Sequence, residues 1–199
     1  MTAVEAFLRD PDHLASDDGS VLGAPTDRLE LYQLAALRRR LLPVLAQLRP
    51  SDFELLARDR NLMILASPTP RVRPQVPPGA IDPVAHGAYS FTGHYLWDAA
   101  TFALDRPPGS WVLKLGRIEV ELAPRLVFAG IVLHECVHVL LNYRLVGGTV
   151  DEAAGQRMED EAVARACELG FRRETKAFID FFATWFPNAG AIIGRLPSA

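Results

Sequence analysis

The strongest constraint on this chain of 199 residues is an apolar stretch of helical length that contains three polar side chains. Between Leu126 and Leu141, every residue is apolar or glycine except His134, Glu135 and His138. A helix that is apolar all round is normally buried inside a domain. A buried polar group without a partner costs several kcal/mol. The sequence therefore predicts a buried helix whose three polar residues share one binding partner.

The spacing of these residues indicates that the partner is a metal ion. His134-Glu135-Cys136-Val137-His138 is an HExxH sequence. Residues four apart lie one helical turn apart on the same face, so both imidazoles can bind one ion. Glu135, rotated by about 100° from His134, can hold and deprotonate a metal-bound water. We therefore predict a zinc site with the two histidines as ligands and Glu135 as general base, in preference to histidines that only form hydrogen bonds in the core.

A catalytic zinc site usually has a third protein ligand and one open position. The helical segment downstream of the motif offers Glu159 and Glu161. Glu159 shares its helical face with small and apolar residues, which can pack closely on another helix. Glu161 shares its side with charged residues, which is typical of a solvated face. We predict Glu159 as the third ligand and keep Glu161 as the fallback.

Composition excludes several other classes of function. The formal net charge is -3, which gives no general attraction to nucleic acid, and the basic cluster Arg38 to Arg40 is predicted to be a solvated helix face. The polar interruptions at 134–138 argue against a membrane span. The N-terminus has no signal-peptide pattern. Cys136 and Cys167 are predicted to be buried free thiols. Free thiols fit the reducing environment of the cytoplasm, which is the predicted location.

Proline content divides the chain into three predicted parts. Residues 1–66 form a helical N-terminal part, and residues 91–199 form the metal-binding domain. Between them, 67–90 is a linker, or a strap or lid over a cleft, because prolines disfavour regular structure. The six prolines of this segment are Pro68, Pro70, Pro74, Pro77, Pro78 and Pro83.

The remaining patterns predict an α+β fold that is mainly helical. Residues 111–122 read as an antiparallel hairpin around Gly116, because polar and apolar residues alternate over 117–122. Residues 11–25 are expected to be loop, and 91–106 to be mixed or helical. The HExxH helix should extend to about Tyr143. Further helices are expected up to Leu169, with Gly170 as the stop, and over 173–186.

A strand, a buried HExxH helix and a second helix that carries Glu159 together resemble the gluzincin group of zinc metallopeptidases, with its zincin-like fold. The resemblance covers roughly residues 110–170. It implies that His134, His138 and Glu159 bind zinc and that Glu135 activates water. Many gluzincins carry an Asp four residues after the ligand Glu, where it supports a histidine. This chain has Val163 at that place.

These features favour zinc-dependent hydrolysis of a peptide or protein substrate. The residues considered for stabilising the oxyanion are Tyr89, His94, Tyr95 and Tyr143. In zincins an extended peptide commonly pairs with an edge strand, a role that 117–122 can take here. A metal-dependent sensor or regulator with little turnover is the alternative. A purely structural zinc site is disfavoured, because such sites usually have four ligands rich in Cys.

Overall fold

The computed structural model describes residues 1–16, 29–67, 93–96, 106–116, 123–143, 152–185 and 194–197. Helices predominate over these ranges and accompany a small sheet, which confirms the predicted mainly helical fold with strands. The helices are α1 (Ala3–Arg9), α2 (Leu29–Leu45), α3 (Pro50–Glu54) with the π-helical segment η1 (Leu55–Asp59), α4 (Arg125–Leu140), α5 (Glu152–Glu168) and α6 (Arg172–Trp185). The strands are β1 (Leu14–Ser16), β2 (Met63–Ser67), β3 (Gly93–Leu96) and β4 (Trp111–Gly116).

The sheet has the strand order β1-β2-β4-β3, and its first three strands are parallel. Only β3 runs antiparallel, against β4. The predicted antiparallel sheet is therefore wrong for most of the strand pairs. Parallel neighbours need a crossover connection, and the helices α2 and α3 supply it between β1 and β2.

The predicted hairpin around Gly116 is also wrong. Strand β4 is hydrogen-bonded to β2 on one side and to β3 on the other, so its edges are occupied by other strands. The second half of that hairpin, 117–122, lies outside the described residues. The alternation over 117–122 carried the prediction, but the pairing of β4 is decided by tertiary contacts that a local pattern does not contain.

Two strands were missed because local sequence did not mark them. Strand β1 lies in the segment expected to be loop, and it has only three residues, too few for a periodic pattern. Strand β3 lies in the segment expected to be mixed or helical. Both become strands because they pair with a neighbour, β1 with β2 and β3 with β4.

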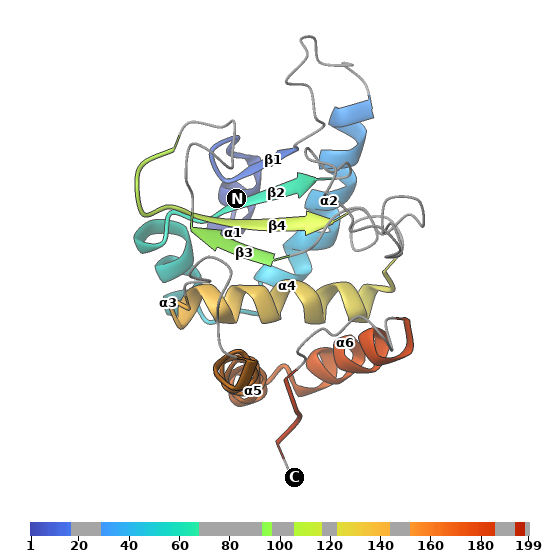
Figure 1. Ribbon diagram of the computed structural model, residues 1–199. Coiled ribbons are helices and arrows are strands. Elements are labelled where there is room, and N and C mark those ends of the chain that lie inside the picture. The colour runs from blue at the N-terminus through green and yellow to red at the C-terminus, as the bar shows by residue number, and fades with distance from the viewer. Residues whose placement is uncertain are drawn as a thin grey trace, which may run out of the picture.

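Helix α4 lies at the centre of the molecule, as Figure 1 shows. It runs below β3, with α5 and α6 below it and α2 crossing behind the sheet. Between Val127 and Val139 every residue except Glu135 is buried, which confirms the predicted buried helix. No helix within the described ranges combines the length and apolar character that crossing a membrane requires.

One hydrophobic core joins residues from both sides of the proline-rich segment. It extends from Phe7 of α1 through the sheet and α4 to Phe178 of α6. The N-terminal residues 1–66 and the residues after 91 each contribute two strands to the same sheet. The predicted strap or linker 67–90 lies, apart from Ser67, outside the described residues, and the three-part division stays a prediction.

The basic cluster of α2 is not simply a solvated face. The Arg40 guanidinium donates to the Ala123 carbonyl at 2.6 Å and lies 4.1 Å from the ring centre of Phe128. Arg38 donates to the Leu8 carbonyl at 2.6 Å. Burial of Arg40 lowers the pKa of its guanidinium. These contacts tie α2 to α1 and to the beginning of α4, so the arginines serve packing rather than a partner.

Helices α4 and α6 approach most closely at Gly130, which generates a first prediction. A Cβ added there would lie 2.2 Å from the Glu174 carbonyl oxygen and 2.8 Å from the Phe178 Cβ. At an unconstrained helix position Gly→Ala stabilises by about 1 kcal/mol. We expect Gly130→Ala instead to lower the free energy of unfolding by about 1–3 kcal/mol, because the helices must separate. Urea denaturation measures this, and equal or greater stability would contradict the close approach.

Candidate metal centre

The two motif histidines face each other from successive turns of α4. Their side chains are almost fully buried, with 3% of His134 and 1% of His138 exposed. The ring centres lie 4.6 Å apart and the ring planes are nearly perpendicular. The two Nε2 atoms are 3.0 Å apart, so both imidazoles direct the same nitrogen to one point.

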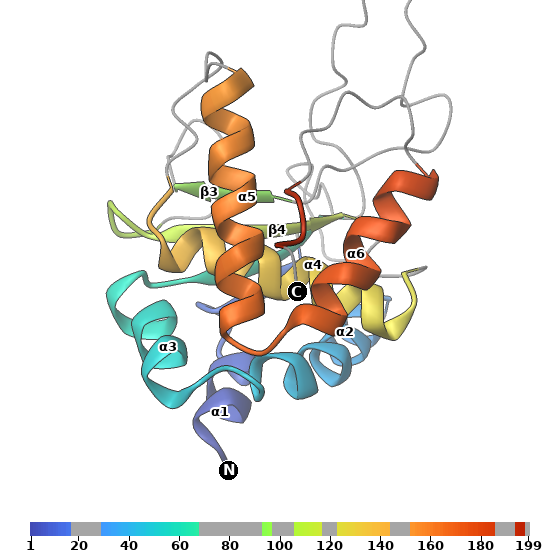
Figure 2. The ribbon, with the colours of Figure 1, turned by 90° about the horizontal axis from the view of Figure 1, so that it is seen from below.

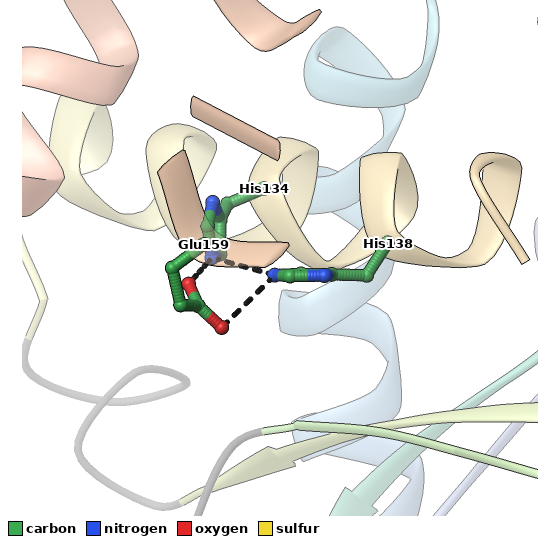
Figure 3. A group of neighbouring side chains, drawn as sticks. All are labelled: His134, His138 and Glu159. Atoms are coloured by element: carbon green, nitrogen blue, oxygen red, sulfur yellow. Dashed lines mark hydrogen bonds and ion pairs between the residues drawn. The ribbon is translucent and has the colours of Figure 1, made fainter. Parts of the chain in front are cut away.

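The third group of the site comes from α5. This helix packs on α4 through a small apolar cluster of Val137, Ala162 and Ala166, the close-packed face that the sequence predicted for Glu159. The Glu159 Oε2 atom lies 2.9 Å from the Nε2 of His134, and its Oε1 atom lies 3.3 Å from that of His138 (Figure 3). One carboxylate oxygen thus faces each imidazole.

Protons alone cannot satisfy this triangle of contacts. Each Nε2 atom carries at most one hydrogen, which it can donate once. If both nitrogens are protonated, each can donate to one Glu159 oxygen, but no hydrogen then joins the two nitrogens across their 3.0 Å gap. If only one is protonated, a nitrogen lone pair faces another acceptor. A single cation between the three groups makes every contact attractive, which favours a metal site over a hydrogen-bonded histidine pair.

The dimensions of the triangle agree with metal binding. A tetrahedral zinc site with ligand distances near 2.0–2.1 Å separates neighbouring ligand atoms by about 3.4 Å. The three separations observed are 2.9, 3.0 and 3.3 Å. Small outward shifts of the side chains are enough to admit the ion. His134, His138 and Glu159 therefore form a group that can hold a metal ion.

The charges of the site suit a cation. Burial opposes ionisation of Glu159, but the two histidines hold the pKa of its carboxyl at about 2, so the carboxylate is charged at neutral pH. Burial also opposes protonation of His134, yet the contact with Glu159 and the charges of Glu135 and Glu159 raise the pKa of this imidazole. Two carboxylates thus create a negative potential at two buried rings.

The other residues of the motif have separate environments. Glu135 is the one residue between Val127 and Val139 that is only half-buried, and it is outside the group that can hold the ion. Cys136 is fully buried, and burial together with the charge of Glu135 raises the pKa of its thiol to about 12. The thiol is therefore protonated at neutral pH, and Cys136 does not belong to the group of described residues that can hold the ion.

The end of α4 brings Tyr143 to the site. The helix stops at Leu140 rather than at Tyr143 as expected, because Asn142 adopts a left-handed backbone with φ 58°. The Tyr143 N–H donates to the His138 carbonyl at 3.1 Å, and the Asn142 N–H donates to the Val139 carbonyl at 3.1 Å. This is a Schellman turn. It folds the chain back so that the rings of Tyr143 and His138 lie 6.0 Å apart.

The fallback ligand Glu161 is not part of the triangle of possible ligands. It is exposed and does not belong to the group that can hold the ion. Partial burial, a hydrogen bond to the Glu161 carboxylate and the charge of that group raise the pKa of Tyr143 to about 12. Glu161 therefore lies near Tyr143, whereas Glu159 faces the histidines.

The remaining candidates are placed less closely. His94 and Tyr95 belong to β3. The structure describes the backbone of this strand but not its side chains, and Tyr89 lies outside the described residues. Phe178 of α6 has its ring centre 4.9 Å from that of His134. No sequence pattern marked this residue as a neighbour of the site.

The support of the histidine rings differs from the gluzincin pattern. Val163 is fully buried, and it stands where many gluzincins have the supporting Asp. The Nδ1 atom of His134 is buried, and no hydrogen-bond partner for it lies within the described part of the chain. Among the described residues, Phe178 packs against this ring.

The triangle generates a second prediction, concerning metal content. We expect the purified protein to bind one divalent ion per chain. His134→Ala and Glu159→Ala should lose binding by a factor of at least about 100, since each removes one of three ligands. Glu161→Ala is the matched control and should bind as the wild type does. Elemental analysis and titration with a chromophoric chelator measure this, and full metal content in Glu159→Ala would refute the assignment.

Comparisons with known proteins provide no further support for the site. No protein-family model, no curated protein and no solved structure matches this chain. The metal centre therefore depends on the geometry of His134, His138 and Glu159, and the resemblance to gluzincins depends on the motif residues.

Proposed function

We propose that this protein is a zinc-dependent hydrolase of peptide bonds. The observation that carries the proposal is the triangle of two imidazoles and one carboxylate, with the half-buried Glu135 beside it. Catalytic zinc sites use three such protein ligands and keep a fourth position open, whereas structural sites usually have four ligands rich in Cys. Within the described residues the group has three members, and the adjacent Cys136 is not one of them.

The chemistry divides between the ion and the chain. Bound zinc supplies a Lewis acid that makes water nucleophilic near neutral pH and polarises a carbonyl. The Glu135 carboxylate accepts the proton of the attacking water and passes it to the nitrogen of the leaving amine. The buried helix α4 excludes bulk water from the ligand side of the site, which strengthens these interactions.

The substrate is proposed to be an extended peptide that pairs with a strand edge. The sequence assigned this role to 117–122, which lies outside the described residues. Within the described sheet the outer strand next to α4 is β3, as Figure 1 shows. Strand addition to β3 would align main-chain carbonyls beside the site and select side chains at alternate positions.

Tyr143 is the oxyanion candidate that the geometry favours. Its ring lies beside His138, and its hydroxyl hydrogen is retained at neutral pH because its pKa is raised to about 12. A protonated phenol can donate a hydrogen bond to a developing oxyanion.

A regulator that binds metal with little turnover is the second candidate. It is favoured by one observation, the absence of a hydrogen-bond partner for the Nδ1 atom of His134 within the described residues. Ligand histidines that lack such a partner bind metal more weakly by a factor of about 10–100. A weak, exchangeable site suits sensing better than sustained catalysis.

The third prediction separates these two functions. Glu135→Gln should abolish hydrolysis of a diverse peptide library, with a loss of at least about 100-fold in kcat/KM, because the amide cannot take the water proton. Its zinc affinity should remain within about threefold of wild type, since the ligands are unchanged. Glu168→Gln changes an exposed carboxylate of α5 that pairs with Arg165, and it is the matched control that should keep wild-type turnover. A wild-type chain that binds zinc but cleaves nothing would favour the regulator.

A fourth prediction concerns Tyr143. Tyr143→Phe keeps the ring beside His138 but removes the hydroxyl donor. We expect kcat to fall on the order of 100-fold with KM little changed, because the lost hydrogen bond acts mainly in the transition state. Steady-state kinetics on one cleaved peptide, with zinc content measured in parallel, provide the check. An unchanged kcat would remove Tyr143 from the catalytic group.

A further inference from the structure

The described C-terminal residues Gly194–Pro197, named here the C-terminal segment, cross α5 at the turn that carries Glu159. Figure 2 shows this segment in the gap between α5 and α6. A Cβ added to Gly194 would lie 2.3 Å from the Glu159 carbonyl oxygen and 2.5 Å from the Val163 Cγ2. Only glycine permits this approach, so the segment contacts the backbone of the third ligand directly.

Arg195 fastens the segment to the residue that follows the ligand. Its backbone N–H donates to the Asp160 Oδ1 at 2.7 Å, while the guanidinium contacts Oδ2 through Nε at 3.1 Å and through Nη2 at 2.5 Å. A two-pronged arginine–carboxylate contact fixes orientation as well as distance. Gln156, one turn earlier, donates to the same carboxylate at 3.0 Å.

The other end of the segment is tied to α6. The Arg172 guanidinium donates to the Pro197 carbonyl at 2.8 Å. Arg172 is the first residue of α6, immediately after the corner where Gly170 ends α5 with φ +96°. The segment therefore links α5 to α6, and α6 in turn packs on α4.

Glu159 needs such support more than the histidines do. The histidines share one buried helix, and its packing sets their separation. Glu159 is a quarter exposed and belongs to another helix, which meets α4 through small side chains. Val163, one turn after Glu159, faces Gly194 of the segment. The place that supports a histidine in gluzincins is thus occupied here by a contact with the C-terminal segment.

We propose that the C-terminal segment is a positioning element of the metal site, in which Gly194 and Arg195 hold the Glu159 turn of α5 against the two histidines. The inference rests on the proposed function, because it requires that zinc is the bound ion. Metal ligands must be held within about 0.5 Å of their productive geometry. None of the residues of the segment is itself a ligand. The segment therefore acts on the metal site only by placing α5.

The test compares zinc affinity in full-length variants by competition with a chelator. Arg195→Ala removes the guanidinium contact at an exposed position and should weaken zinc binding about tenfold. Gly194→Ala should weaken it at least as much, because the Cβ displaces the α5 backbone. Arg165→Ala is the matched control, since it removes an exposed arginine–glutamate pair with Glu168 on the same helix. It should leave affinity within about twofold of wild type.

Two further measurements separate positioning from general stability. The visible absorption spectrum of the Co²⁺-loaded protein should change in Arg195→Ala and not in Arg165→Ala, and Arg195→Lys should recover part of the lost affinity. A lower melting temperature of the metal-free variants with unchanged zinc affinity and Co²⁺ spectrum would overturn the positioning role and leave the proposed function standing. Failure of the wild-type chain to bind zinc would overturn both.

Discussion

The arrangement that the rest of the structure depends on is a pair of imidazoles buried in an apolar helix. Neither ring can reach bulk water from within α4, and their Nε2 atoms lie 3.0 Å apart. Burying polar groups in this way is costly unless each finds a partner. Glu159 supplies a charge of the right sign, but protons cannot make all three contacts attractive at once. A cation bound between the three groups would make every contact attractive.

The elements around α4 bury this helix almost completely, whereas Glu159 of the neighbouring helix stays a quarter exposed. The sheet and α2 cover α4 from one direction, and α5 and α6 cover it from the other. Glu135 is only half-buried within this packing. The Schellman turn after Leu140 places the Tyr143 ring 6.0 Å from that of His138. A carboxylate and a phenol therefore lie near the two histidines.

Sequence reasoning identified the site better than it identified the fold. The motif spacing and the small apolar face of α5 were enough to choose Glu159, because helical periodicity fixes which residues share a face. The strand pairing was mispredicted, since the alternation over 117–122 says nothing about which strands flank β4. The left-handed turn at Asn142, which places the Tyr143 ring beside His138, has no signal in the sequence. The role of the C-terminal segment depends on contacts with α5, such as the one between Arg195 and Asp160. These residues are 35 positions apart, and no local sequence pattern reveals such a contact.

The three ligands are therefore held by two different physical means. Close packing of α4 fixes the two histidines whether or not an ion is present, because a buried helix has no room to rearrange. Glu159 is placed by α5, which packs on α4 through small apolar side chains and is tied to Arg195 by polar contacts at the surface. Exposed hydrogen bonds and ion pairs each contribute on the order of 1 kcal/mol. Because the carboxylate lies against two imidazoles, an ion bound between the three groups would stabilise the packing of α5 on α4.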